Sequence, residues 1–60
     1  MTTLTLFKAN GGWMVRSTDP EVFALFGTDT LPTPFTDEAS ADSVRDTIER
    51  LNPGAEIIFA

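Results

Sequence analysis

The chain has 60 residues, a formal net charge of −5 and 42% hydrophobic residues. This length suits one domain, residues 1–60, and the composition is that of a folded protein rather than a disordered one. The sequence contains no cysteine and no histidine, which excludes disulfides, thiolate chemistry and the usual zinc sites.

A β-hairpin is expected at the start of the chain. Residues 3–8 alternate polar and apolar side chains, which is typical of a strand with one buried face, and residues 13–17 form a second candidate strand. Asn10-Gly11 is the preferred pair for a type I′ turn, because both positions of that turn need a positive φ. A turn at Gly11-Gly12 would instead mix polar and apolar residues on both faces.

The turn at Asn10-Gly11 determines which side chains share a face, because opposite residues of a hairpin lie on the same side. One face then carries four apolar residues, and we expect the helix to cover it: Leu4, Leu6, Trp13 and Val15. Three further large apolar residues point the other way: Phe7, Met14 and, on the last strand, Ile58.

A short helix is predicted over residues 19–27. Asp19 can cap its N-terminus, Pro20 suits the first helical position and Gly27 suits the left-handed stop. Residues 28–36 can form neither a helix nor a central strand, because two prolines remove backbone donors and hold their neighbours extended, so we expect an ordered extended link outside the three-stranded sheet. Leu31 and Phe35 are expected to anchor this segment.

A longer helix is predicted over residues 37–51, with Thr36 as its N-cap, or Ser40 if the helix starts late. Its buried stripe consists of residues at helical spacing: Ala41, Val44, Ile48 and Leu51. Pro53-Gly54 suits the centre of a type II turn, and residues 56–59 form a last, apolar strand.

The order of elements predicts an α+β fold: a three-stranded, mainly antiparallel sheet with one long helix packed on one face. A last strand beside the first would make the sheet wholly antiparallel. A last strand beside the second would run parallel to it through a right-handed crossover. The sequence favours neither order.

The reverse face of the sheet, with Phe7, Met14 and Ile58, needs a cover. In one interpretation the segment 20–35 folds under the sheet and covers it with Phe23, Phe26, Leu31 or Phe35. In the other, this face or a neighbouring sheet edge is an interface with a second copy or another protein.

The acidic residues of the long helix form a solvated face rather than a metal site. Four of them share one side of the helix: Glu38, Asp42, Asp46 and Glu49. Two arginines lie at contact spacing, which predicts the pairs Asp42–Arg45, Arg45–Glu49 and Asp46–Arg50.

The turn Thr28-Asp29-Thr30 is a candidate ligand site, although Asp29 more simply bonds its own backbone in an Asx turn. Trp13 could stack on a base or a sugar, but core packing explains it better. No hydroxyl has a histidine or a positioned lysine to activate it, so we expect no catalytic residues, no cofactor and no metal.

The acidic net charge argues against nucleic acid as a partner. No apolar run is long enough to span a membrane, and neither a signal-like pattern nor a cysteine is present, so a cytoplasmic location is expected. The sequence therefore predicts a small non-enzymatic protein-interaction module whose partner is a protein or a second copy, as in a homodimer. The alternative is an acidic mimic, or antitoxin-like inhibitor, of a basic nucleic-acid-binding protein.

Two segments carry a resemblance. ALFGTDTLPTPF, residues 24–35, and LNPGAEI, residues 51–57, look like segments of small uncharacterised bacterial proteins, to which no function is attached. The order of elements from NGGW, residues 10–13, to the helix also resembles HicB-type antitoxins in architecture. The Pro-Gly-Cys step and the DNA-binding element of that family are missing here, which leaves no residue role to carry over.

Overall fold

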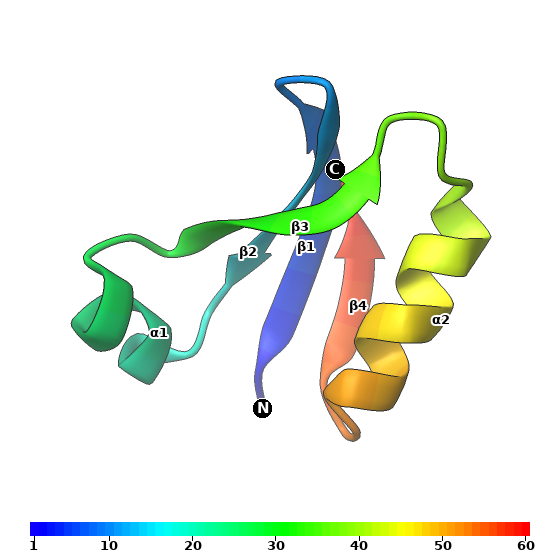
Figure 1. Ribbon diagram of the computed structural model, residues 1–60. Helices are drawn as coiled ribbons and strands as arrows, with labels where there is room; N and C mark the ends of the chain where they lie inside the picture. The colour runs from blue at the N-terminus through cyan, green and yellow to red at the C-terminus, as the bar shows by residue number, and fades with distance from the viewer.

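A computed structural model describes all residues 1–60 and shows an α+β fold (Figure 1). Its elements are β1 (Thr3–Ala9), β2 (Gly12–Ser17), α1 (Pro20–Phe26), β3 (Thr30–Thr36), α2 (Ala41–Leu51) and β4 (Glu56–Phe59). The strands form one mixed sheet of four strands in the order β3-β2-β1-β4. The longer helix, α2, lies beside β4, and α1 lies at the opposite end of the molecule.

The hairpin of β1 and β2 has the predicted register. Leu6 lies opposite Val15 and Phe7 opposite Met14. Asn10 and Gly11 have φ values of 54° and 78°, as a type I′ turn requires. The local turn chemistry therefore sets the two faces of the sheet as expected.

The segment expected to lie outside the sheet is instead a strand of it. β3 pairs antiparallel with β2, and Leu31 lies opposite Val15. The prediction of a three-stranded sheet is therefore wrong: we excluded residues 28–36 from a central strand and expected an extended link, without considering an edge strand. Prolines are excluded only from central strands, and β3 is an edge strand.

The ladder explains how one of these prolines is accommodated. The backbone N–H of Ser17 donates to the carbonyl of Asp29 at 2.9 Å. Hydrogen-bonded pairs alternate with non-bonded pairs in an antiparallel ladder, so Pro32 opposite Met14 falls in a non-bonded pair. Its nitrogen faces the open edge, where no donor is needed.

The last strand lies beside β1 but runs parallel to it, with Leu4 beside Ile57. Neither of the two arrangements that the sequence left open combines a parallel last strand with a place beside β1. The first has the observed neighbour, β1, with the antiparallel direction, and the second has a parallel last strand beside β2 instead of β1. The reason is β3: one additional strand reverses the chain once more, so α2 returns it to start β4 in the direction of β1.

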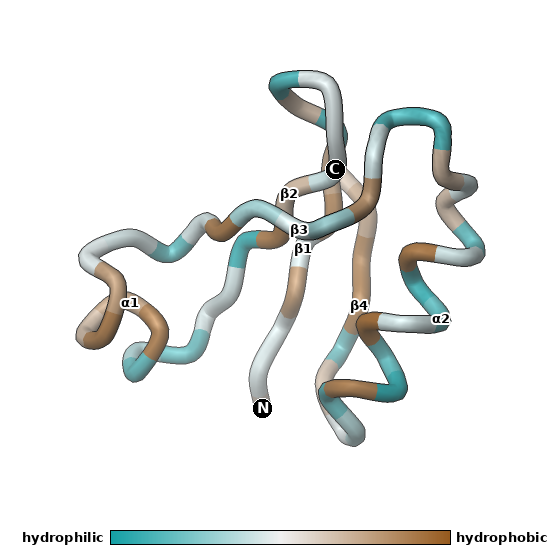
Figure 2. The backbone as a smooth tube through the Cα atoms, viewed as in Figure 1, coloured by the Kyte–Doolittle hydropathy of each residue, from teal (hydrophilic) through white to brown (hydrophobic).

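Helix α2 begins at the later of its two predicted starts. The Ser40 hydroxyl accepts a hydrogen bond from the backbone N–H of Ser43 at 3.2 Å and caps the helix, whereas Thr36 ends β3. Within the predicted stripe Val44 and Ile48 are buried, but Leu51 in the last turn is 72% exposed. The hydrophobic positions of α2 lie on the side nearest β4 (Figure 2).

The core lies between α2 and one face of the sheet. Its six buried residues are Leu4, Leu6, Trp13, Val44, Ile48 and Ile57. Trp13 is only 5% exposed, and its indole Nε1 donates to the carbonyl of Ala39 at 3.1 Å. The Trp13 ring therefore packs in the core, as expected, and holds the loop before α2 against the sheet.

Candidate functional site

The reverse face holds the predicted patch, but most of that patch is covered. Phe7 and Met14 are half-buried, and the guanidinium carbon of Arg16 lies 5.3 Å from the centroid of the Phe7 ring. Only Ile58 is well exposed, at 42%. The three residues therefore do not form a large open apolar surface.

The segment 20–35 does not provide this cover. Leu31 shares the face of Val15, on the side of α2, and Phe35 packs against the core. Phe23 and Phe26 are 58% and 61% exposed. The predicted folding of the segment under the sheet is wrong, because β3 extends the sheet sideways and leaves α1 at its margin.

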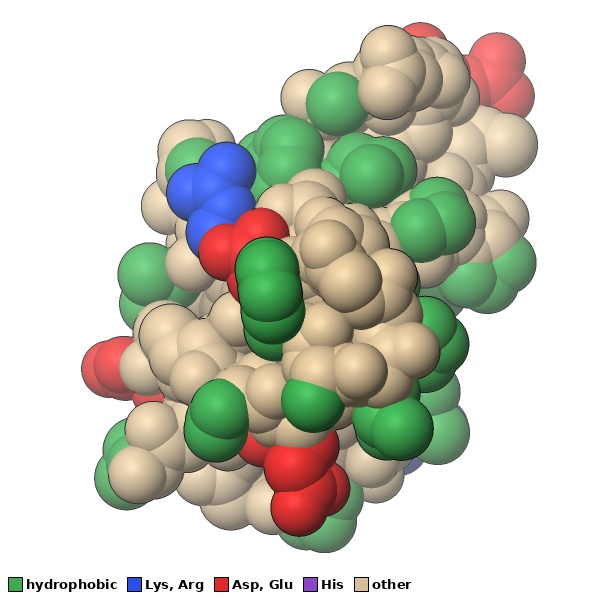
Figure 3. Space-filling model, turned by 90° about the vertical axis from the view of Figure 1, so that its left-hand side faces the viewer, with side chains coloured by type: hydrophobic (Ala, Val, Ile, Leu, Met, Phe, Trp, Pro, Cys, Tyr) green, Lys and Arg blue, Asp and Glu red, His purple; other side chains and the backbone are tan.

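Helix α1 carries the most exposed apolar surface of the molecule, and this was not expected. No residue of the helix is buried, and Leu25 is 76% exposed. Figure 3 looks at the side of the molecule that carries α1, where apolar side chains lie between polar ones. The sequence shows the apolar stripe, but it does not show that the stripe lacks a neighbour.

The helix is nevertheless held firmly at both ends. The Asp19 carboxylate accepts a hydrogen bond from the backbone N–H of Glu21 at 3.0 Å. Gly27 adopts a φ of 73°, and its N–H donates to the carbonyl of Phe23 at 2.8 Å. These predicted caps stabilise the helical conformation of α1 although the helix contributes little to the core.

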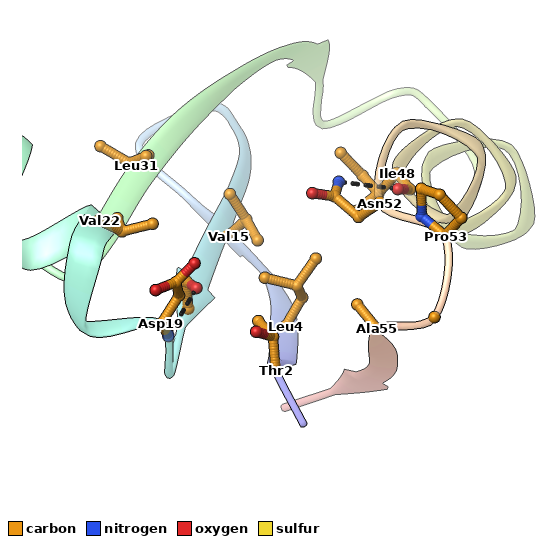
Figure 4. Close-up of a pocket in the computed structure, with 12 residues that line it drawn as sticks. Thr2, Leu4, Val15, Asp19, Val22, Leu31, Ile48, Asn52, Pro53 and Ala55 are labelled. Atoms are coloured by element: carbon orange, nitrogen blue, oxygen red, sulfur yellow. Dashed lines mark hydrogen bonds between the residues drawn. The ribbon is translucent and has the colours of Figure 1, made fainter.

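A groove of about 480 Å³ lies between α1 and the C-terminal end of α2 (Figure 4). Its apolar lining includes Leu4, Val15 and Leu31 from three neighbouring strands, with Val22 on the side of α1. The groove exists because α2 packs near β4 and leaves this part of the same sheet face uncovered.

Polar groups face each other across this groove. Asp19 lies on the side of α1 and Asn52 on the side of α2 (Figure 4). Asn52 donates through its amide nitrogen to the carbonyl of Ile48 at 2.9 Å, which leaves its side-chain oxygen as an acceptor. No lysine or arginine lines the groove. The site therefore favours an apolar group that carries a hydrogen-bond donor or a positive charge.

The turn predicted as a polar ligand site uses its groups internally. The hydroxyl of Thr28 accepts from the backbone N–H of Thr30 at 3.2 Å, and the Thr30 hydroxyl donates to the Asp29 carboxylate at 3.0 Å. The turn is thus closed by Thr28, not by the Asx turn of Asp29 that we expected.

Two of the three ion pairs expected on α2 are present. Arg50 contacts Asp46 at 3.0 Å and Arg45 contacts Glu49 at 3.9 Å, all of them exposed. No group of three acidic residues is arranged to hold a metal ion. The guanidinium groups of Arg45 and Arg50 interrupt the acidic face of α2. The alternative function, as an acidic mimic that inhibits a basic nucleic-acid-binding protein, depends on that face, and the geometry does not favour it.

Comparison with protein-family models, curated proteins and solved structures gives no match to this chain. Neither helix combines the length and hydrophobicity needed to cross a membrane. The candidate site is therefore interpreted from its geometry alone. It comprises the apolar side chains of α1 and the adjoining groove.

Proposed function

We propose that the protein is a small non-enzymatic interaction module that binds a protein partner through α1 and the adjoining groove. One observation carries this proposal: a helix capped at both ends presents Phe23, Leu25 and Phe26 to solvent. Apolar side chains exposed together on an ordered element are typical of an interaction surface.

The helix and the groove form one continuous surface. Val22 lines the groove, and Phe26, one helical turn later, lies on the same side of α1. A phenylalanine exposes roughly 200 Å² when free, so the three exposed side chains together present about 400 Å². That is half of what one partner contributes to a standard interface, about 800 Å², and the groove extends the surface further.

The charge of this surface selects the chemistry of the partner. The chain has a net charge of −5, and Asp19 is the one acidic or basic residue that lines the groove. A partner segment with apolar side chains beside a lysine or arginine would satisfy both the groove and Asp19. Its association would be faster at low salt, because opposite charges steer the encounter.

Replacing Phe23 and Phe26 together by serine should abolish partner binding without unfolding the protein. Both side chains are more than half exposed, so the free energy of unfolding should change by less than about 1 kcal/mol. Aromatic anchors at interface centres contribute about 2 kcal/mol or more each, so loss of both, about 4 kcal/mol, should lower the affinity about 800-fold. The wild-type and variant chains would be immobilised, and the proteins that each of them captures would be compared. Any captured protein would then be purified and titrated against each chain to measure its affinity.

Leu51→Ser is the matched control, because Leu51 is 72% exposed on α2 and its side chain does not line the groove. A partner lost from the double variant, retained by the control and bound as a purified protein supports the proposal. Equal binding by all three chains would show that α1 is not the docking surface.

A further inference from the structure

The two edges of the sheet differ in their protection against further strands. The β3 edge contains Pro32 and Pro34, which cannot donate backbone hydrogen bonds. The β4 edge contains no proline, and its one charged residue, Glu56, lies at the start of the strand. β4 is therefore the edge that another strand can join.

The hydrogen bonds of β4 show which backbone groups remain free. The N–H groups of Glu56 and Ala60 donate to the carbonyls of Thr2 and Leu6 in the direction of β1, at 2.9 and 3.1 Å. Alternate residues of a strand face opposite edges, so Ile57 and Phe59 direct their N–H and C=O groups away from the sheet.

We propose that β4 pairs antiparallel with β4 of a second copy, on a two-fold axis at Ile58. In this register Ile57 of each copy lies opposite Phe59 of the other, and the four outward-facing residues exchange four hydrogen bonds. In a register centred on Ile57, only the two copies of Ile57 would bond to each other. In a register centred on Phe59, only the two copies of Phe59 would do so. The Ile58 register is therefore the one that satisfies the whole free edge of the strand.

Side chains and charge agree with this register. Ile58 of the two copies meets on the reverse face, and Phe59 packs beside Ile57 of the other copy. Both Ile58 and Phe59 are 42% exposed in the single chain, so pairing covers apolar surface. Glu56 lies opposite Ala60 of the other copy, so no like charges oppose each other across the ladder.

The result is a continuous sheet of eight strands with a proline-bearing β3 at each end, which stops further addition of strands. The interface is small, because each copy contributes a strand of four residues. We therefore expect a concentration-dependent dimer rather than a permanent one. This surface is separate from α1, so the dimer does not depend on the proposed partner site.

A single cysteine at position 58 tests the register directly, since the chain has none of its own. Opposite residues in a non-bonded antiparallel pair have Cα atoms about 4.5 Å apart, within the range of a disulfide. Mild oxidation of Ile58→Cys should yield a covalent dimer at least about tenfold faster than oxidation of Leu25→Cys. Leu25 is a stringent control because, at 76%, it is the more exposed position.

Sedimentation of the unmodified chain gives a second readout. The average mass should rise with concentration between about 10 µM and 1 mM, as for a small, weak interface, and Ile58→Lys should remain monomeric. Equal oxidation rates at the two positions, faster dimerisation of Leu25→Cys, or an unmodified chain that stays monomeric throughout would each overturn the proposal. The variant with both Phe23→Ser and Phe26→Ser should still dimerise. Loss of partner binding through α1 and loss of the β4 dimer can therefore be told apart.

Discussion

The Trp13→Ala variant is expected to lose most of the free energy of unfolding of the protein at 25 °C. Trp13 is 5% exposed, contacts Phe59 with ring centroids 6.0 Å apart, and holds the carbonyl of Ala39 through its indole N–H. Removing a buried tryptophan costs about 3–5 kcal/mol. A domain of this length has a total stability of about 3–9 kcal/mol. Circular dichroism with urea titration of the wild type and the variant measures the loss.

Trp13→Phe separates packing from hydrogen bonding at the same position. The smaller ring keeps part of the apolar contact but leaves the Ala39 carbonyl without its donor. The loss in the free energy of unfolding should therefore be about 1–3 kcal/mol, and the variant should remain folded. A Trp13→Ala variant with a urea midpoint close to that of the wild type would show that the tryptophan is not a core residue.

Leu6→Ala is expected to be the second most damaging change, with a loss of about 2–5 kcal/mol in the free energy of unfolding. Leu6 is fully buried, at 0% exposure, on β1, one of the two inner strands of the sheet. Its replacement leaves a cavity between the sheet and α2, which a small core cannot easily close. Thermal unfolding followed by circular dichroism gives the change in Tm.

Leu25→Ala removes the same atoms from a side chain that is 76% exposed. This change should shift the free energy of unfolding by less than about 0.5 kcal/mol. Comparable losses from the two leucine variants would contradict the arrangement, because they would place Leu25 in a packed core.

The parts of the fold that local chemistry determines were predictable from the sequence. The register of the hairpin follows from Asn10-Gly11, and the ends of α1 follow from Asp19 and Gly27. The inward position of Trp13 follows from that register. Each of these features depends on residues close together in the chain.

The features that depend on distant partners were not predictable in the same way. Whether residues 30–36 form a strand depends on the free edge of β2, and the direction of β4 follows from that one strand. The groove depends on where α2 packs across the sheet. The apolar stripe of α1 is visible in the sequence, but its exposure is a property of the assembled fold.

The central claim is that α1 holds Phe23 and Phe26 in solvent instead of covering the reverse face of the sheet. Proton NMR with a soluble nitroxide, at a concentration where the chain is monomeric, tests it most directly. The ring signals of Phe23 and Phe26 should broaden strongly, whereas those of Trp13 and the methyl groups of Leu6 should stay sharp. Protected phenylalanine rings that show nuclear Overhauser contacts to Phe7 or Met14 would contradict the claim.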